Sequence, residues 1–333
     1  MKPLIQKLVE TQGPSGYESQ IRAVVREEVE PYADALQVDA LGNLIVQKGK
    51  GSADGIKIML AAHIDEIGVM VTQVDENGFV RFTTLGGVRP SNCIGGRVKF
   101  LNGAAGVIYM EPPDDMTKLP TIEQLYIDLG LSSSQDAKVR IGDVGTFDRP
   151  FLDLGKRLVA KSMDDRIGTA VLVETLRQVK DTPHQLYFVF STQEEVGLRG
   201  ATTAAFGIDP DLGLSVDVTD TGDTPRRTKV RMEVSLGKGP AIKVRDSGML
   251  ADRRVVDWLV RGAEKLKLPY QMEILERGTT DARAMQIARA GVPAGCLSIP
   301  CRYIHSPSEM VDFEDVQNAV RLLVDLVSHP VEL

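Results

Sequence analysis

Cysteine is scarce in this chain of 333 residues, and the three that occur, Cys93, Cys296 and Cys301, show no CxxC spacing. An odd number of scattered cysteines argues against a disulfide framework and against a zinc site built from thiolates. We therefore expect a reducing compartment and a cytoplasmic protein. A long apolar run is also missing, since no stretch of about 18 apolar residues occurs and Glu10 interrupts the first residues before a signal-peptide core can form. The sequence predicts no membrane segment.

Basic residues are not in excess. The 39 lysines and arginines are outnumbered by 46 aspartates and glutamates, which gives a net charge of -7 at pH 7. A nucleic-acid-binding protein would present a basic face, so neither nucleic acid nor a membrane is an expected partner. With 43% apolar residues the composition is that of an ordinary globular protein, and the length suggests about two domains.

Two sequence textures divide the chain. In residues 1–67 and 160–333, buried strands alternate with helices, which is typical of an α/β sheet covered by helices. Residues 68–159 show short alternating runs separated by glycine and turn residues, and this texture predicts a small β-barrel or sandwich. We therefore expect one α/β domain, built from both outer ranges, with an all-β domain inserted into it.

Hydrophobic periodicity predicts the individual elements. Two short strands surround residues 41–43, and helices occupy the N-terminal residues on either side of the turn at 13–16. Buried strands are expected at 56–62, 185–192, 212–218 and 294–299, and helices at 166–179, 250–266 and 311–327. One further helix, at 121–129, is expected to interrupt the β domain.

Histidines and carboxylates gather at the carboxyl ends of the predicted buried strands, where open α/β sheets bind their ligands. Of the four histidines, His63 and His305 follow strands, whereas His184 and His329 lie in contexts typical of the surface. His63 could bind a metal through one ring nitrogen while Asp65 accepts a hydrogen bond from the other. A strand-end histidine that hydrogen bonds to a neighbouring loop is the simpler alternative.

Acidic residues mark three further element ends. Asp164 and Asp165 stand at the start of a helix, where they either flank a cation or cap the helix. Glu194 and Glu195 follow an apolar strand, where a solvated turn is the ordinary explanation, and a glycosidase acid–base pair is disfavoured because neighbouring side chains diverge. Asp217 ends another buried strand, where a lone aspartate is usually a turn former.

Each of these places has an ordinary explanation when it is taken alone. Together, two histidines, two aspartates and a glutamate at one sheet edge form an oxygen-and-nitrogen ligand set that suits Zn²⁺ or a related divalent ion. Such a set exceeds what one catalytic zinc usually takes from protein, because one position must stay open for water. Two metal ions that share a carboxylate fit it better.

The chain contains, in this order, the strings HIDEIG, SMDDRIG, QEEVGLRG, DVTD and RYIHSPSEM, which are preceded by GPSGYE and ALGNLIV. With these motifs the sequence resembles the M42 family of metallo-aminopeptidases over essentially its whole length. The resemblance implies a sheet sandwiched by helices, with an inserted PDZ-like or barrel domain that mediates dimerisation. It also implies peptide substrates and a homo-oligomer, a dimer that often builds a dodecamer.

The resemblance further implies a role for each site residue. Glu194 would be the general base, Asp65 would orient His63, and the peptide between Asp164 and Asp165 would be cis. The ions would be zinc or cobalt, with manganese as a further candidate. The metal ligands would form two sets that share Asp164, with His63, Asp164 and Asp217 in one and Asp164, Glu195 and His305 in the other.

Such a centre predicts amide hydrolysis. With a water acidified between two cations, Glu194 would take its proton and hand it to the leaving amine after the carbonyl is attacked. A related metal-dependent amidohydrolase, such as a deacylase or carboxypeptidase, is an alternative because the same metal pair hydrolyses many amides. A catalytically silent oligomeric binding protein that kept the fold is another.

One segment, GTTDARAM, falls where the family has a Gly-Gly-(Thr/Ser)-(Asp/Asn)-Ala stretch near the active site, which implies that Thr280 and Asp281 bind substrate. This chain departs from the pattern, because Thr279 stands where glycine is common. Capping of a helix by Thr280 and Asp281 explains the same residues equally well.

Overall fold

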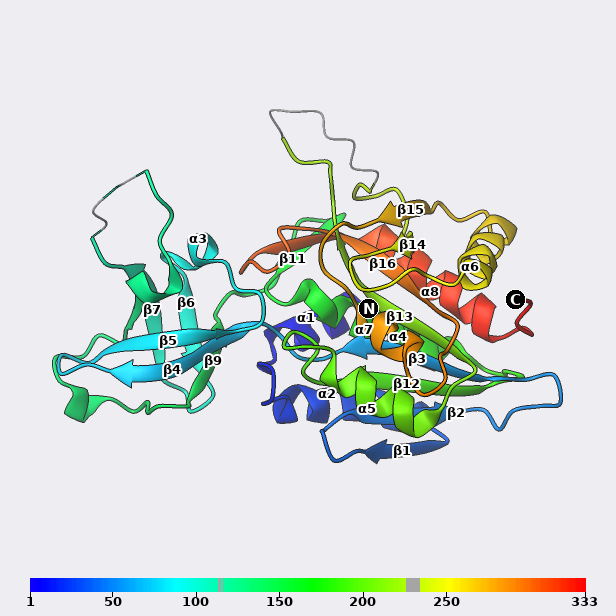
Figure 1. The fold of residues 1–333 in the computed structure, drawn as a ribbon, viewed down its shortest axis with the longest axis horizontal. Coiled ribbons are helices and arrows are strands. Elements are labelled where there is room, and N and C mark those ends of the chain that lie inside the picture. Colours follow the sequence, from blue (N-terminus) through cyan, green and yellow to red (C-terminus); the bar gives the residue numbers. More distant parts are fainter. Residues whose placement is uncertain (113–114, 116, 226–233) are drawn as a thin grey trace.

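In the computed structural model, which describes residues 1–112, 115, 117–225 and 234–333, the chain forms two lobes (Figure 1). The larger lobe has helices on both faces of a sheet, and the smaller one is a closed β-barrel. The predicted fold class, an α/β sheet with an inserted all-β unit, is confirmed. Among the described residues, no helix is long and apolar enough to cross a lipid bilayer.

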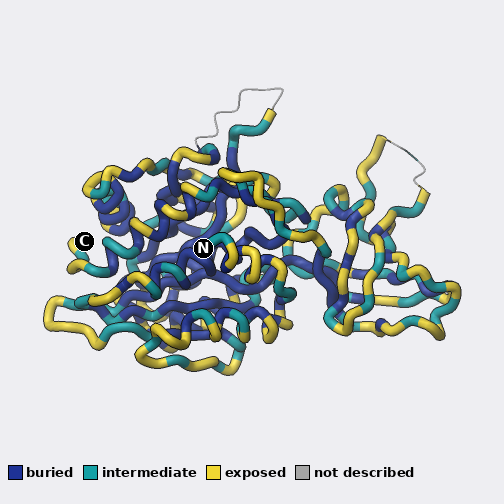
Figure 2. Tube along the Cα trace, turned by 180° about the vertical axis from the view of Figure 1, so that it is seen from behind, coloured by how far each residue is buried: buried dark blue, intermediate teal, exposed yellow. Residues whose placement is uncertain are grey.

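The central sheet has the strand order β1-β2-β12-β3-β13-β16-β17-β11-β10, with β14 and β15 attached beside β16. Its middle strands β12, β3, β13 and β16 are parallel. Because helices cover both faces, these strands are almost continuously buried, which is why they read as unbroken apolar runs (Figure 2). The strands of the sheet are β1 (Ala35–Val38), β2 (Leu44–Lys48), β3 (Lys57–His63), β10 (Leu152–Asp153), β11 (Arg157–Ala160), β12 (Gln185–Ser191), β13 (Leu212–Asp220), β14 (Ala241–Arg245), β15 (Gln271–Ile274), β16 (Ala294–Arg302) and β17 (Glu309–Asp312).

Helices α1, α2, α4, α6 and α8 share the main core with one face of the sheet, and α5 and α7 pack on the other. The predicted helix at 311–327 is correct only from residue 313, because the preceding residues form β17 and Asp312 caps the helix through the backbone N–H groups of Glu314 and Asp315. The helices are α1 (Lys2–Glu10), α2 (Ser19–Val29), α4 (Met163–Gln178), α5 (Arg199–Ile208), α6 (Arg253–Lys265), α7 (Asp281–Gln286) and α8 (Phe313–Val327).

The smaller lobe is a closed barrel with the strand order β4-β5-β8-β7-β6-β9 and its own apolar core. Closure leaves the sheet without free edges. After β9 the chain returns to the central sheet through β10 and β11; the division of the chain at residues 68 and 159 stays a prediction. The barrel elements are β4 (Gly68–Val74), β5 (Phe79–Leu85), α3 (Pro90–Cys93), β6 (Arg97–Phe100), β7 (Ala105–Met110), β8 (Leu125–Asp128) and β9 (Val144–Phe147).

The predicted helix at 121–129 is wrong. Within this range the structure has a short 3-10 turn, Ile122–Gln124, followed by strand β8, which pairs with β5 and β7. Leu125 and Ile127 are fully buried in the barrel core, while Asp128 is exposed. That alternation is the two-residue period of a strand, and barrel closure selects it over the helical spacing.

The surface position predicted for His184 is also wrong. His184 is buried, its Nδ1 accepts a hydrogen bond from the Ile56 backbone N–H at 3.2 Å, and its Nε2 lies 2.8 Å from the His329 carbonyl oxygen. The ring therefore joins the start of β3 to the C-terminal residues. The three cysteines are buried free thiols, as a scattered, odd set predicts.

Candidate metal centre

The central sheet brings the predicted site residues to one edge. His63 is the last residue of β3, and its neighbour in the register, Ser191, ends β12 just before Glu194 and Glu195. Asp217 lies in the C-terminal half of β13, beside β16, which leads to His305. The carboxyl ends of parallel strands therefore assemble side chains that are up to 242 residues apart (305 − 63) in the sequence.

Asp164 is the centre of this assembly. Its Oδ1 lies 2.9 Å from Nε2 of His63, and its Oδ2 lies 3.2 Å from Nε2 of His305. His305 Nε2 also lies 3.2 Å from Oε1 of Glu195. The potential ligand atoms therefore form two clusters, and within each cluster they all lie within 4.8 Å of one another. The first cluster is His63, Asp164 and Asp217, and the second cluster is Asp164, Glu195 and His305.

The two adjacent aspartates divide the roles that the sequence left open. Asp164 and Asp165 depart from helical φ and ψ at the start of α4, and the peptide bond between them is cis. Asp165 Oδ1 accepts a hydrogen bond from the Gly168 backbone N–H at 3.0 Å, which is a capping interaction. Asp164 faces the two histidines, so one carboxylate caps the helix while the other joins the clusters.

Asp65 holds the segment that carries the two glutamates. Its carboxylate accepts hydrogen bonds from the backbone N–H groups of Glu194 at 2.9 Å and Glu195 at 3.2 Å, and from the Ser15 hydroxyl at 2.6 Å. Nδ1 of His63 lies 3.1 Å from the backbone oxygen of Asp65 and 3.5 Å from its carboxylate. Asp65 therefore contacts the histidine chiefly through its main chain.

The site has more buried negative charge than it can balance alone. Burial is the main reason that the pKa values of Glu194 and Asp217 lie well above their usual range, and nearby carboxylates add to the effect. Burial opposes a charge on His305, but Asp164 and Glu195 outweigh it and raise the pKa of His305 to about 12. The crowding of buried carboxylates therefore favours a cation in this pocket.

The residues fit a divalent metal ion. Imidazole nitrogens and carboxylate oxygens are the donors that Zn²⁺, Co²⁺ and Mn²⁺ accept. Oε1 of Glu195 is buried without a hydrogen-bond donor among the described residues, although it faces His305. A cation between these groups would satisfy that oxygen and offset the crowded charge.

The clusters line a cleft of about 470 Å³. Thr280 lies on its wall and caps α7 by accepting a hydrogen bond from the Ala282 backbone N–H at 3.3 Å. Asp281 is buried, hydrogen bonds to the Ser191 hydroxyl and is absent from the lining. Burial raises the pKa of Asp281 to about 6. Capping by Thr280 is thus observed, and contact with substrate stays a prediction for both residues.

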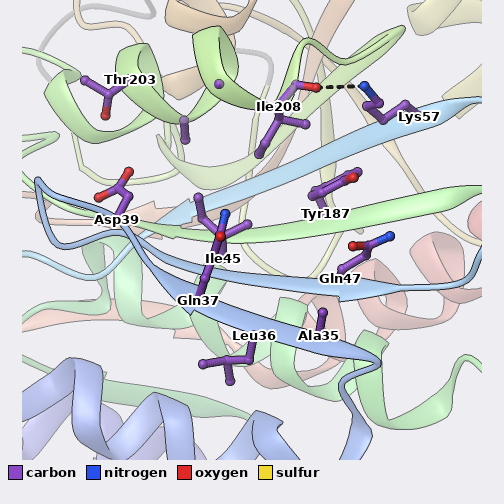
Figure 3. A pocket seen from close by; sticks show the side chains of 12 residues that line it. Ala35, Leu36, Gln37, Asp39, Ile45, Gln47, Lys57, Tyr187, Thr203 and Ile208 are labelled. Carbon is purple, nitrogen blue, oxygen red and sulfur yellow. Dashed lines mark hydrogen bonds between the residues drawn. The ribbon is translucent and has the colours of Figure 1, made fainter.

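A second cavity, of about 490 Å³, lies among β1, β2, β12 and α5 (Figure 3). Among the described residues that line it, Asp39 is the one carboxylate, and its oxygens accept hydrogen bonds from the backbone and side chain of its own turn, residues 41–43. Neither histidine nor a second acid accompanies it. The cavity therefore lacks a metal-binding set.

Sequence reasoning missed three residues that contact the second cluster. Glu309 accepts hydrogen bonds from the backbone N–H groups of Asp164 and His305. From the barrel lobe, the Asn92 side chain donates to the His305 carbonyl oxygen at 3.2 Å, and Gly87 lies against the His305 ring. For Glu309, the one signal available in the sequence was a glutamate four residues after His305. The contacts of Asn92 and Gly87 leave no local pattern in the sequence.

Solved structures with this architecture include peptidases. An aminopeptidase from the archaeon Desulfurococcus kamchatkensis superposes with a TM-score of 0.94 at 39% identity, covering 98% of this chain and 94% of that chain. The TET1 peptidase of Pyrococcus horikoshii, which can assemble into a tetrahedron or a large octahedral shell, gives a TM-score of 0.87 at 31% identity with 98% of each chain covered. These likenesses, together with the sequence relatives described next, identify the chain as a hydrolytic exopeptidase.

The family is defined by sequence as well. The model of the M42 glutamyl aminopeptidase family matches residues 42–322. A protein of Acetivibrio thermocellus that carries a provisional aminopeptidase name is 46% identical over 330 residues, 98% of each sequence. The chain belongs to the M42 glutamyl aminopeptidase family, and the family resemblance stated from the motifs is confirmed.

Proposed function

We propose that the chain is a dinuclear metal-dependent aminopeptidase that removes N-terminal residues from peptides. The observation that carries this proposal is the carboxylate of Asp164, whose two oxygens each lie beside Nε2 of one histidine. A carboxylate so placed is suited to bridge two cations. The first cluster, His63, Asp164 and Asp217, would hold one ion, and the second, Asp164, Glu195 and His305, the other.

When bound, such a pair of cations lowers the pKa of a water molecule and polarises the scissile carbonyl. Glu194 lines the cleft but belongs to neither cluster, and its Oε2 lies 3.9 Å from Nε2 of His63. Its carboxylate would accept the proton of the attacking water and deliver it to the leaving amine. Asp65 would hold Glu194 in place through the backbone. Adjacent glutamates thus divide two tasks, since Glu195 binds the ion and Glu194 stays free.

Glu194→Gln tests this division. The variant should bind Zn²⁺ as tightly as the wild type, because no cluster ligand changes, while kcat falls about 10²- to 10⁴-fold with the loss of the base. Glu27→Gln, at an exposed position on α2, is the matched control and should leave both quantities unchanged. Wild-type kcat in Glu194→Gln would remove Glu194 from the role.

A substrate panel tests the reaction class. Peptides with a free N-terminal amine should be cleaved and their N-blocked counterparts should not; the reverse result would favour the deacylase alternative. Removal of metal by a chelator, followed by separate addition of Zn²⁺, Co²⁺ and Mn²⁺, would identify the ion that supports activity. The cytoplasmic location expected from cysteine usage stays a prediction.

We also propose that the chain forms a homo-oligomer in which the barrel mediates dimerisation and dimers build a dodecamer. The P. horikoshii relative supports assembly of this kind. On the barrel lobe, the apolar side chains of Val107, Tyr109 and Ile141 are 43%, 50% and 73% exposed, and dimerisation through the barrel would bury such surface. Light scattering should give a mass of twelve chains, and Tyr109→Lys with Ile141→Lys should reduce it.

A further inference from the structure

Glu309 joins the two chain segments that carry the second cluster. It is the first residue of β17 and is 1% exposed. Its Oε2 accepts a hydrogen bond from the Asp164 backbone N–H at 2.9 Å, and its Oε1 accepts one from the His305 backbone N–H at 2.8 Å. Each oxygen of one buried carboxylate therefore holds one residue of the centre, although Glu309 contributes no atom to either cluster.

Both residues held by Glu309 lie outside regular helix and strand geometry. His305 has φ of 60°, in the left-handed region that a residue with a side chain rarely adopts. Asp164 departs from helical φ and ψ, at −75° and 106°, at the start of α4. The backbone N–H groups at these positions have no regular helix or strand partner, so an external acceptor determines where they point.

The supporting strand is itself fixed. Glu309 pairs with Ala160 of β11, and the following residue, Met310, pairs with both Val159 and Arg302. A carboxylate attached to a strand between two neighbours has little freedom to move. Burying a carboxylate is costly unless its oxygens are hydrogen bonded, and here both backbone donors come from residues of the second cluster.

We propose that Glu309 is a positioning residue that sets the spacing between Asp164 and His305, and so the affinity of the second cluster for its metal ion. The inference rests on the proposed dinuclear centre. It also predicts an asymmetry. The second cluster contains both residues that Glu309 holds, whereas the first contains only Asp164. Loss of the two hydrogen bonds should therefore weaken one metal-binding step more than the other.

The chain contains a matched control for this geometry. Asp315 of α8 is also 1% exposed, and its carboxylate accepts hydrogen bonds from the backbone N–H groups of Gly237 and Gly239, both at 2.7 Å. Neither glycine belongs to a cluster. Amide substitution at Glu309 or Asp315 thus removes the same kind of interaction, near the centre in one case and away from it in the other.

The experiment measures Zn²⁺ binding to the metal-free full-length protein by competition with a chelator, together with thermal unfolding of the metal-free protein. In Glu309→Gln the single carbonyl oxygen can serve one backbone N–H, and the amide NH₂ opposes the other. We expect one of the two binding steps to weaken about 10- to 100-fold, with the other changed less. Asp315→Asn should lower the unfolding temperature but keep both zinc affinities.

Glu309→Asp keeps two acceptor oxygens, so it should weaken the same zinc-binding step less than Glu309→Gln does. If the glutamine variant does not fold, the aspartate variant replaces it. An unchanged zinc affinity in the aspartate variant would then overturn the proposal. Folded Glu309→Gln with wild-type zinc affinities also overturns it, as does an equal loss in Asp315→Asn. Failure of the wild type to bind two zinc ions would instead reject the dinuclear centre itself.

Discussion

Gly87 of the barrel lobe is a position where one added methyl group should disturb the proposed metal centre, because the glycine lies against the His305 ring. An added Cβ would lie 2.5 Å from Nδ1 and 2.7 Å from Cε1 of His305. Gly87 is absent from the residues with positive φ, so alanine can adopt its backbone conformation without strain. The contact can therefore be relieved only if the ring or the barrel segment moves.

The size of that movement follows from the contact distances. Non-bonded heavy atoms pack comfortably at roughly 3.5 Å, so the ring in Gly87→Ala must shift by about 1 Å. Nε2 of His305 lies 3.2 Å from oxygens of both Asp164 and Glu195. Metal–ligand distances tolerate changes of only about 0.2 Å, and a misplacement of about 1 Å can cost about 10²-fold in rate. Gly87→Ala should therefore weaken zinc binding about 10- to 100-fold and lower kcat by a similar factor.

The assay is zinc competition on the metal-free protein, followed by kinetics at saturating zinc. Gly207→Ala is the matched control, because Gly207 lies in α5, lacks a positive φ, and its added Cβ would meet no heavy atom within 4 Å. That substitution should leave zinc affinity unchanged and stabilise the helix by about 0.5 to 1 kcal/mol. Wild-type zinc affinity in a folded Gly87→Ala protein would refute the reasoning.

Further predictions concern the support of the site, stability against acid, and metal removal. Asp65→Asn leaves one acceptor oxygen for the backbone N–H groups of Glu194 and Glu195. The free energy of unfolding in urea should fall by about 1 to 3 kcal/mol, and kcat should also fall. Unchanged values would show that these hydrogen bonds do not hold the two glutamates. Burial lowers the pKa of His184 below its ordinary value of 6.5, so the unfolded chain binds the extra proton first, and the free energy of unfolding should fall as pH drops below 6.5. His184→Gln should flatten that slope, and a parallel slope would contradict the assignment. Chelation should lower the unfolding temperature, and zinc at about 100 times its Kd should restore about 2.7 kcal/mol, unless the folded state binds no metal.

The sequence was most informative where one side-chain property repeats along an element. The parallel strands β3, β12, β13 and β16 appear as apolar runs because both of their faces are covered, and the predicted site residues follow from their carboxyl ends. His63 and His305 stood out because the chain has only four histidines.

Other features depend on contacts that no local pattern records. Ile122, Leu125 and Leu129 recur at helical spacing in the sequence, but pairing with β5 and β7 makes residues 125–128 a strand. The sequence could not decide which of two adjacent aspartates caps α4, because either can reach the helix N-terminus. Glu309 was overlooked because its partners are backbone N–H groups, which every residue type except proline carries.

The contacts of Asn92 and Gly87 with His305 tie the barrel to the second cluster. A hinge motion between the lobes would pull on a histidine of the second cluster, so the lobes cannot swing apart freely while that histidine keeps its place. Forces applied to the barrel, for example by neighbouring copies in the proposed oligomer, would reach the proposed metal centre through these contacts. Catalytic competence would then depend on how the barrel is held.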